Sequence, residues 1–441
     1  MTRRSMLTKL ALGTAGVAVG AINLRGIEPA STSRLSLTDD LFLEELSRAS
    51  FTFFRECTNP KTGLVKDAAR FPESKNNTVS SIAATGFGLT ALCIAEQRGW
   101  LKRKEAIARA RTALRFLWRE MPHEHGFFYH FVDWRTGKRV WNCEVSSIDS
   151  AILLCGVLSC AQHFPGDEIK ELAACIYDRM DWQWLLRDGR FLGHGWTPER
   201  GFLTAKWDTY CEHMMLYLLA IGARKNAIPA STWEAWHRPK LRYEDEEYIG
   251  TNAPLFVHQY SHAWFDFRRQ RDAHTDYFHN STLATYAHRR FCTELADEFP
   301  HYSKELWGIT SSDSPNGYAV WGGPPRFGPI DGSVVPCAVG GSLPFLANDS
   351  IATLRHMRER FGSRIWNRYG FADAFNPATG WVANGCIGIN TGITLLMAEN
   401  ARSGFGWDLF MKNSEARKAM ELVGFRESGL ISYRQNSPIT I

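Results

Sequence analysis

Residues 79–97 are apolar or small on nearly every face of the helix that their spacing predicts. Such a helix is buried on all sides, as in the inner layer of a large helical protein. The next predicted helix, residues 102–120, carries Lys and Arg on one face and Ala, Leu, Phe and Trp on the other, which is typical of an outer layer. This alternation of inner and outer helices predicts an all-α helical toroid.

The remaining chain shows helices joined by long loops. Further helices are predicted over residues 39–57, 147–163, 167–184, 209–222, 277–299, 350–361, 391–402 and 413–423. Strand signals are few, and residues 126–132 could form half of a minor β-hairpin closed by a turn at residues 135–138. Over residues 248–345, Gly and Pro are interleaved with Trp, Phe and Tyr, which favours a shaped groove over a flexible linker.

Composition allows one large domain or two ordinary ones, because the 441 residues are 44% hydrophobic and 22% charged. No linker divides the chain beyond its first segment, so we expect one catalytic domain over residues 39–441. Much of the formal charge of +5 lies in the N-terminal segment, and the body has no basic run, which gives little support to nucleic-acid binding. The 16 Trp, 13 Tyr and 27 Phe exceed the needs of one core, so some should line a groove.

The first residues resemble a twin-arginine export signal. Arg3 and Arg4 precede a mildly apolar segment, residues 10–22, which is too short for a membrane span of ~20 residues. We therefore expect a signal over residues 1–30 and a polar linker over residues 31–38. The expected partner is the twin-arginine export machinery, the expected location is the periplasm or the medium, and no stable membrane anchor is expected. An ordinary start with two arginines is the alternative.

The ten cysteines include no C-x-x-C pair, and several lie in apolar helical stretches. Free cysteine in such a place behaves as a small buried hydrophobe. The twin-arginine route carries proteins that have already folded in the reducing cytoplasm. For these reasons neither disulfides nor a zinc site is expected.

Twice in the chain a tryptophan precedes an acid at the start of an apolar helix. Trp141 comes before Glu144 and Asp149, and an apolar run follows them. Trp207 comes before Glu212, and a second apolar run follows. Sugars bind to aromatic faces, and pairs of carboxylates cleave glycosidic bonds. The repeated arrangement predicts a glycosidase with both tryptophans in contact with the substrate.

Two of these acids have a structural alternative. Asp149 stands three residues after Ser146, which is the spacing of a capping box. Glu212 stands at the same spacing from Thr209. For either pair alone capping is the readier explanation, although the first turn of an inner helix can also face a central funnel. A helix N-terminus favours an ionised carboxylate by about 0.3–1 kcal/mol when exposed, which suits a base or nucleophile better than a proton donor.

Two further acids lie among apolar and aromatic neighbours. Glu144 stands between a Cys and a Val, and a carboxyl in such surroundings has its pKa raised, as a general acid requires. Its alternative is a surface salt bridge. Asp373 has a phenylalanine two residues away on either side, and its alternative is a turn. Asp313 and Asp331 are predicted to be turn residues rather than catalysts.

Other chemistries fit the sequence less well. His258, His262 and Asp266 are spaced to lie on one helical face. Because Gln259 excludes the H-E-x-x-H zinc motif, a packed or sugar-contacting stripe is the better interpretation. Gly86 begins a G-x-G-x-x-A pattern without the preceding strand that a dinucleotide site needs. There is no G-x-S-x-G elbow and no phosphate-binding P-loop, and no metal or organic cofactor is implied.

Five segments are distinctive in combination. They are C-E-V-S-S-I-D (143–149), Y-L-L-A-I-G (217–222), F-V-H-Q-Y-S-H-A-W (256–264), W-G-I-T-S-S-D-S-P (307–315) and Y-G-F-A-D-A-F-N-P (369–377). With these segments the chain resembles the bacterial glucoamylase-like family, whose characterised relatives include the endo-β-1,2-glucanases of glycoside hydrolase family 144. The resemblance spans roughly residues 39–425. It implies an (α/α)6 toroid with long aromatic Gly/Pro-rich loops, and hydrolysis or transfer on β-linked glucans.

The resemblance also implies a set of site residues. The family's acidic pocket would correspond to Glu144, Asp149, Glu212 and Asp373. The residues expected to contact substrate are Trp141, Trp207, His262, Trp264, Trp321 and Trp381. Family members often carry an Asp in an Ile-Asp-x-Gly segment where this chain has Asn390, so its substrate or its activity could differ.

The sequence as a whole predicts an exported glycoside hydrolase that acts on an oligo- or polysaccharide. The substrate that we expect is a β-linked glucan, with β-1,2-glucan as the first candidate. Glu212 and one of Glu144 or Asp149 would form the carboxylate pair. A transglycosylase or a lyase on the same toroid is one alternative. A non-catalytic glycan-binding protein is another, because Asn390 could mark the loss of an essential acid.

Overall fold

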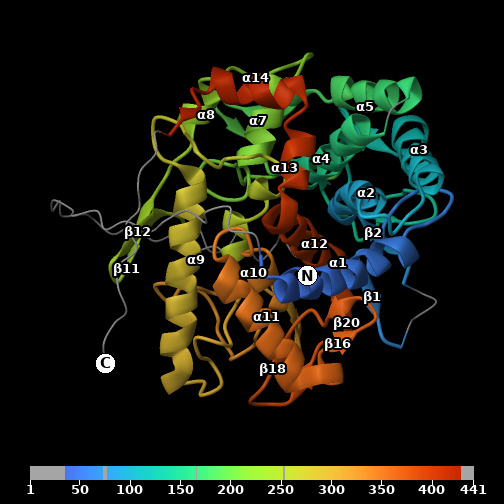
Figure 1. Cartoon of the computed structure of the whole chain (residues 1–441). Helices are drawn as coiled ribbons and strands as arrows, with labels where there is room; N and C mark the ends of the chain where they lie inside the picture. The colour runs from blue at the N-terminus through green and yellow to red at the C-terminus, as the bar shows by residue number, and fades with distance from the viewer. Residues whose placement is uncertain (1–34, 73–76, 165, 252–253, 429–441) are drawn as a thin grey trace.

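The protein is described by a computed structural model that covers residues 35–72, 77–164, 166–251 and 254–428. The predicted signal, residues 1–30, lies outside these residues. Helices make up most of the regular secondary structure of the described residues (Figure 1). The α-helices are α1 (Leu37–Glu56), α2 (Ile82–Gln97), α3 (Arg103–Arg119), α4 (Ser147–His163), α5 (Asp167–Arg179), α6 (Trp182–Leu185), α7 (Met214–Gly222), α8 (Thr232–Ala235), α9 (Tyr277–Glu294), α10 (Pro336–Gly340), α11 (Ala347–Phe361), α12 (Gly388–Ser403), α13 (Phe405–Phe410) and α14 (Ser414–Leu422). The 3-10 helices are η2 (Leu255–His258), η3 (Ser261–Ala263), η4 (Leu295–Asp297) and η5 (Gly362–Arg364).

Buried helices form an inner ring. All residues of α7 and α10, and nearly all of α2, α4 and α12, are buried. Around the ring α12 contacts α2, α2 contacts α4, α4 contacts α7, and α10 contacts α12. The segment η2–η3 fills the place between α7 and α10, because Ser261 Oγ accepts from Met215 N (3.0 Å) and Gln259 donates to Ala338 O (2.9 Å). The predicted (α/α)6 toroid is confirmed.

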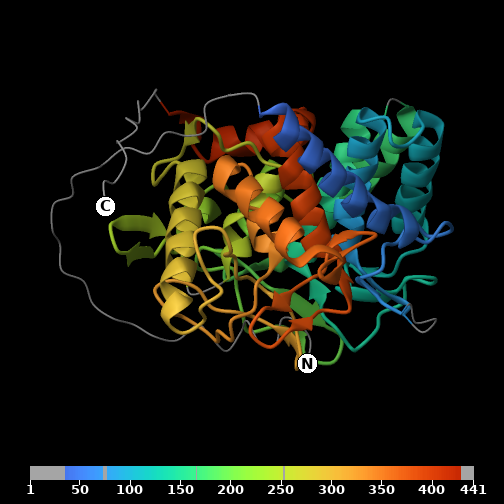
Figure 2. The same cartoon turned by 60° about the horizontal axis from the view of Figure 1, so that its bottom comes forward.

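An outer layer surrounds this ring. The amphipathic helices α1, α3, α5 and α11 each bury one face and expose the other. Figures 1 and 2 show α3 and α5 outside α2 and α4, and α9 along the opposite side of the molecule. The helices α2 and α4 approach very closely, since a Cβ at Gly86 would overlap Ile152 O and a Cβ at Gly156 would overlap Gly86 O. The G-x-G pattern at Gly86 therefore serves helix packing.

The strands are short and form small antiparallel sheets near the ends of the helices. The pairs are β1 (Ala68–Arg70) with β20 (Gly385–Ile387), β2 (Val79–Ser81) with β5 (Phe131–Asp133), β3 (His123–Glu124) with β4 (Phe127–Phe128), β6 (Val145–Ser146) with β9 (Gly195–Thr197), β9 with β10 (Gly201–Phe202), β7 (Leu186–Arg187) with β8 (Phe191–Leu192), β11 (Lys240–Tyr243) with β12 (Glu246–Ile249), β13 (Gln270–Arg271) with β21 (Arg426–Glu427), β14 (Ser312–Ser314) with β15 (Gly317–Ala319), β16 (Trp366–Asn367) with β17 (Gly370–Phe371), and β18 (Phe375–Asn376) with β19 (Trp381–Val382). The predicted turn at residues 135–138 is present, because Asp133 N donates to Lys138 O (2.8 Å).

Three helix predictions were wrong by five residues at one end. The helix expected over residues 167–184 stops at Arg179, because Met180 is extended and Asp181 caps a new short helix through Trp184 N (3.1 Å). The helix expected over residues 277–299 continues past Glu294 only as the 3-10 turn η4. The helix expected from residue 209 begins at Met214 instead.

The segment with His258, His262 and Asp266 is not one helix. It consists of the two 3-10 turns η2 and η3, so the three side chains do not share a helical face. His258 Nδ1 lies 3.1 Å from the Tyr210 hydroxyl, and Asp266 pairs with Arg268. The packed-residue interpretation of the two histidines agrees with their nearly complete burial. No helix among the residues that the structure describes has the length and apolar character needed to cross a membrane.

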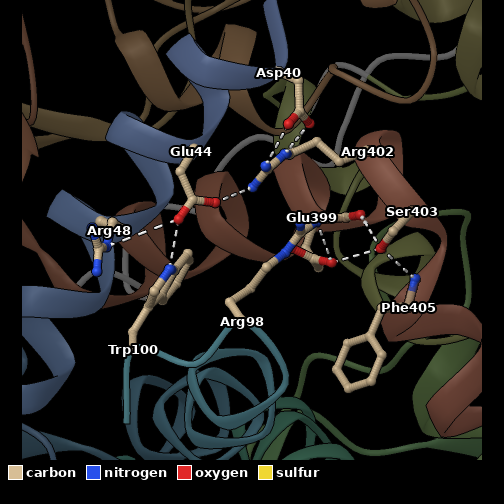
Figure 3. Close-up of polar contacts among 9 residues, drawn as sticks. All are labelled: Asp40, Glu44, Arg48, Arg98, Trp100, Glu399, Arg402, Ser403 and Phe405. Atoms are coloured by element: carbon tan, nitrogen blue, oxygen red, sulfur yellow. Dashed lines mark hydrogen bonds and ion pairs between the residues drawn. The ribbon is translucent and has the colours of Figure 1, made fainter. Parts of the chain in front are cut away.

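The ring has two ends that differ in their side chains. The helices α2 and α12 begin at one end, which we call the mouth, and finish at the other, which we call the base. Because α12 has 16 residues, the two ends lie about 24 Å apart. At the base, the side chain of Arg402 is 2% exposed and donates to both oxygens of Asp40 (2.7 and 3.0 Å) and to Glu44 (2.9 Å) (Figure 3). Arg98 forms a two-bond pair with Glu399 (both 2.9 Å), so ion pairs join α1, α2 and α12.

Candidate active site

The starts of the inner helices meet at the mouth through backbone hydrogen bonds. These bonds join the first residue of α12, α2 or α4 to the loop before a neighbouring inner helix. They are Gly388 N to Asp67 O (2.7 Å), Ile82 N to His130 O (3.2 Å) and Ser147 N to His194 O (3.1 Å). Side chains from the loop before each helix are therefore brought to one end of the ring, although they are far apart in the sequence.

Three titratable side chains lie together at the start of α4. His130 Nδ1 is 3.0 Å from Glu144 Oε1, and His130 Nε2 is 3.6 Å from Asp149 Oδ2. All three residues are buried, with 6–8% of their surfaces exposed. Glu144 lies directly before β6, and a Cβ at Gly195 would come within 2.9 Å of its Cγ, so the strand β9 packs closely against this carboxylate. Two predicted acids, Glu144 and Asp149, are thus neighbours in the structure.

Helix capping by Ser146 at the start of α4 is confirmed. Ser146 is the N-cap residue, and its Oγ accepts from Asp149 N (3.2 Å) while its hydroxyl donates to the Asp149 carboxylate. Ser146 therefore caps the helix, and the Asp149 carboxylate that accepts from it also faces His130.

The second predicted capping box is wrong. Thr209 pairs with His237 through the backbone, and α7 begins at Met214 without a side-chain capping bond. Glu212 is buried in the turn before that helix, where its carboxylate accepts from the Cys211 thiol and its carbonyl accepts from Ser261 Oγ (2.7 Å). The argument that helix capping keeps Glu212 ionised therefore does not apply.

Trp207 connects the two helix starts. Its indole nitrogen donates to Ser147 Oγ at the start of α4 (2.9 Å), and its ring centre lies 5.7 Å from that of His213, beside Glu212. Since α4 and α7 are also in contact, Glu212 lies on the same side of the molecule as Glu144. The prediction that these acids gather at adjacent inner helices is consistent with this arrangement.

A second acidic cluster lies at the start of α12. Asp373 accepts from Asp313 N (2.7 Å) and from the Asn390 side chain (2.9 Å). Asp313 was predicted to be a turn residue, but it lies in β14 and pairs with Arg70. Asn390, the departure from the family pattern, is therefore a hydrogen-bond donor to one of the predicted acids.

The aromatic predictions divide into exposed and buried residues. Trp141 is 60% exposed, has a left-handed backbone (φ +56°) and lies 5.1 Å from the Phe131 ring, next to His130. Trp381, in β19, is half-buried. Trp141 is thus the most exposed of the predicted substrate-contacting aromatic residues.

Four predicted contact residues lie in the core. Trp264 is 0% exposed and donates to Thr90 Oγ1 (3.0 Å), so its ring cannot stack on a sugar. His262 is 1% exposed, and burial lowers its pKa to about 3. Trp207 and Trp321 are also buried, and Trp321 donates to Ser312 Oγ (3.0 Å). For Trp264 and His262 the prediction of substrate contact was wrong, because complete burial leaves no surface for a ligand.

Two cysteines lie close to the predicted acids. Burial raises the pKa of Cys143, beside Glu144, to about 11. Burial also raises the pKa of Cys386, near Asp373, to about 12. Because the thiolate is the reactive form, neither thiol suits a nucleophilic role at neutral pH. The oxygen acids remain the groups suited to chemistry at this end of the ring.

His130, Glu144 and Asp149 also form the one group in the described chain whose ligand atoms could meet at a single metal ion, since these atoms lie within 4.8 Å of one another. The sequence interpretation missed His130, whose position follows from the hairpin that sets its backbone N–H against Glu144 O (2.9 Å). It also missed Arg70. The predicted hairpin was a usable signal for His130, because a hairpin there brings the chain back so that Glu144 lies beside His130.

Comparisons with known proteins agree with this architecture. The Glycoamylase family model, described as "Putative glucoamylase", matches residues 204–414. The resemblance to the glucoamylase-like family is confirmed. The family match includes Glu212, Asp373 and Asn390, and it begins after Glu144 and Asp149.

Three relatives represent the glucoamylase-like similarity. An exo β-1,2-glucooligosaccharide sophorohydrolase of Parabacteroides distasonis is 27% identical over 89% of this chain, which spans 59% of that relative's length. The structure of a β-1,2-glucanase from the same organism has a TM-score of 0.82 and 26% identity, covering 88% of this chain and 60% of the other. An endo-β-1,2-glucanase from Chitinophaga pinensis, in complex with sophorotriose and glucose, has a TM-score of 0.82 and 23% identity over 89% of this chain and 99% of its own. The last similarity concerns the fold alone.

Proposed function

We propose that this protein is a glycoside hydrolase that cleaves β-1,2-linked glucan. The observation that carries the proposal is the position of Glu144, Asp149 and Glu212, three buried carboxylates at the starts of two adjacent inner helices. Burying several acids costs free energy, so a chain keeps such a group where its chemistry is needed. The linkage is inferred from the relatives, which act on β-1,2-linked glucans or glucooligosaccharides.

Roles follow from the contacts of each acid. Asp149 lies in the first turn of α4, where its carboxylate accepts from the Ser146 hydroxyl, and we assign it the role of base or nucleophile. Glu212 caps no helix and takes a thiol as one partner, so we assign it the role of proton donor to the leaving oxygen. Glu144 or Asp149 then activates the attacking water or attacks the sugar directly.

The test is a panel of linked glucans with the purified protein and its Glu212→Gln variant. We expect new reducing ends from β-1,2-glucan with the unchanged protein, and none with a variant that keeps its circular dichroism spectrum and its melting temperature. Unsaturated products that absorb in the ultraviolet would identify a lyase. Binding without cleavage across the panel would identify a glycan-binding protein, and full turnover by Glu212→Gln would remove Glu212 from the mechanism.

We also propose export through the twin-arginine route, on the evidence of Arg3, Arg4 and the apolar segment that follows them. The experiment is to express the full chain with and without Arg3→Lys and Arg4→Lys together, and to measure the protein in the periplasmic and cytoplasmic fractions. The double variant should accumulate in the cytoplasm. Equal distribution of the two proteins would rule out a twin-arginine signal.

A further inference from the structure

The backbone just before Glu144 has a disfavoured conformation. Trp141 and Asn142 are both left-handed, with φ of +56° and +47°. Residues with side chains rarely adopt this region, and a bulky residue adopts it least often. Trp141 supplies little packing of its own to hold the turn, because the residue is 60% exposed. A conformation of this kind persists only where surrounding groups fix it.

Arg139 fixes this segment through its carbonyl groups. Its Nε atom donates to Cys143 O (2.5 Å), and its Nη2 atom donates to Asn142 O (2.7 Å). One guanidinium therefore bonds the carbonyls of both residues that lie between Trp141 and Glu144. The planar fork of an arginine presents its donors in a rigid geometry, so the two carbonyls are held at a fixed spacing.

Arg139 is held in turn by a second hairpin. Its Nη1 and Nη2 atoms donate to the two carboxylate oxygens of Glu199 (2.6 and 3.0 Å), which lies in the turn between β9 and β10. The guanidinium also lies 5.2 Å from the centre of the Tyr129 ring. The strand β9 packs closely against Glu144, since a Cβ at Gly195 would come within 2.9 Å of its Cγ. Arg139 thus joins the two hairpins that lie beside Glu144.

We propose that Arg139 is a positioning residue which, together with Glu199, fixes residues 141–143 and so sets where Trp141 meets the sugar and where the Glu144 carboxylate acts. This inference rests on the hydrolase function proposed above. An ion pair with a carboxylate that is 56% exposed contributes little to stability. The pair should therefore affect the shape of the segment more than the folding of the chain.

Arg139→Lys keeps the charge and removes the fork. A lysine ammonium is a single donor centre, so it cannot bond both carbonyls and both oxygens of Glu199 in the observed geometry. We expect kcat on β-1,2-glucan to fall about 10–100-fold, because a misplaced catalytic group costs up to about 10²-fold. KM should rise about 2- to 10-fold as Trp141 leaves its place. The melting temperature should change little.

Glu199→Gln tests the same pair from its exposed side, where a substitution puts folding at less risk. Its amide oxygen accepts from Arg139, and its amide nitrogen cannot. The kcat and KM should change in the same directions as in Arg139→Lys, by smaller factors. The double variant should lose little more than Arg139→Lys alone, because residues that act as a unit give non-additive effects. Additive losses in kcat/KM would overturn the joint role of the two side chains.

Fluorine NMR of protein labelled with fluorotryptophan reports the surroundings of Trp141 without any measurement of activity. The Trp141 line is assigned from the Trp141→Phe variant. It should shift or broaden in Arg139→Lys, since the residue is no longer held in its left-handed turn. The lines of buried tryptophans such as Trp264 should stay in place, which distinguishes a local change from a general loosening of the fold.

Arg268 supplies a matched control. It forms a two-bond pair with Asp266 (2.9 and 2.8 Å), and its guanidinium lies 4.0 Å from the centre of the Trp407 ring. It lies near Gly404, the residue that follows α12 at the base. Arg268→Lys removes an arginine fork of the same kind, and we expect it to leave kcat, KM and the Trp141 line unchanged.

The NMR readout also separates this proposal from the hydrolase proposal. A Trp141 line that moves in Arg139→Lys and stays in Arg268→Lys supports the fixing of the segment, and in a protein inactive on every glucan it would contradict the hydrolase proposal alone. An Arg139→Lys protein with the Trp141 line of Arg268→Lys would overturn the proposal, even if it loses activity through a lower melting temperature. So would a moved line in an active protein whose kcat and KM do not change.

Discussion

The two ends of the ring hold their acids in different ways. At the base, Asp40 and Glu44 accept from Arg402, and Glu399 accepts from Arg98 (Figure 3). At the mouth, the side chains that bond Glu144, Asp149, Glu212 and Asp373 include those of His130, Ser146, Cys211 and Asn390, whereas the neighbouring Asp313 pairs with Arg70. The first set consists of permanently charged partners. The named partners of Glu144, Asp149, Glu212 and Asp373 are neutral or titratable donors.

This difference separates structural acids from reactive ones. An arginine remains protonated at any pH that the protein meets, so a carboxylate paired with it stays ionised. The Arg402 guanidinium accordingly lowers the pKa of Asp40. A carboxylate bonded to a hydroxyl, a thiol or an imidazole can still gain or lose a proton at moderate pH, which general acid and base catalysis requires. The ion pairs at the base thus hold the helices of the ring together, whereas the partners at the mouth leave its acids able to transfer protons.

Removal of one acid at the mouth should give the largest effect. Glu144→Gln is expected to lower kcat/KM on β-1,2-glucan by about 10²–10⁴-fold, the usual contribution of a proton-transfer group. The free energy of unfolding should stay the same or rise, because one negative charge leaves a crowded cluster. Glu44→Gln at the base is the control and should retain turnover. A Glu144→Gln protein that unfolds more readily and keeps its activity would reverse the comparison.

Removal of the central arginine at the base should act on stability instead. Arg402→Met leaves Asp40 and Glu44 without their shared partner, and we expect a loss of about 2–4 kcal/mol in urea unfolding, reduced by the partial exposure of the two acids. The kcat/KM of the folded fraction should not change. Arg368→Met removes an exposed pair with Glu56 and should cost less than about 1 kcal/mol. Equal losses in the free energy of unfolding for Arg402→Met and Arg368→Met would show that the burial of Arg402 adds nothing to stability.

The layers of the fold could be predicted from the sequence because burial follows from periodicity. The helix at residues 147–163 was predicted at both of its ends, since Ser146 and Asp149 define its start locally. The same pattern at Thr209 and Glu212 predicted a start that does not exist, because the chain there pairs with His237 and becomes helical only after Glu212. Helix capping depends on residues that are neighbours in the sequence, whereas the backbone pairing that competes with a helix start involves residues that are distant in the sequence.

The site could be predicted only in part, for a similar reason. Glu144 and Asp149 are close in sequence, so their proximity is almost assured. His130 joins them through a hairpin, which a sequence pattern predicts only approximately. The exposure of aromatic residues could not be predicted at all: Trp141 and Trp264 are the same residue type, and only the packing of the inner ring puts one at the surface and the other in the core.

The core histidines give a smaller and pH-dependent effect. Burial lowers the pKa of His262 to about 3, against about 6.5 in an unfolded chain. As the pH falls below about 6.5, His262 becomes protonated in the unfolded state and stays neutral in the folded state. The contribution of neutral His262 to the free energy of unfolding is therefore complete above about pH 6.5 and is lost as the pH falls toward 3. The expected slope is about 1.4 kcal/mol per pH unit for one histidine.

His262→Asn tests this slope, because it removes the titrating group from the core. Urea unfolding between about pH 6 and pH 4 should show a shallower decline in the variant than in the unchanged protein, by about 1.4 kcal/mol per unit. Parallel slopes for the His262 variant and the unchanged protein would mean that His262 is protonated inside the core.

Trp141 should give the smallest effect, confined to binding. Its ring is 60% exposed on a left-handed turn beside the acids, and an aromatic contact contributes about 0.5–1.5 kcal/mol beyond its buried area. Trp141→Ala should therefore raise KM about 2- to 10-fold with kcat little changed, and Trp141→Phe should retain most of the affinity. Trp100→Phe, which loses the bond from the indole nitrogen to Glu44 at the base (2.6 Å), should leave KM unchanged. A raised KM for Trp100→Phe together with an unaltered KM for Trp141→Ala would place the sugar-binding surface away from the mouth, and the division between a reactive end and a structural end would then fail.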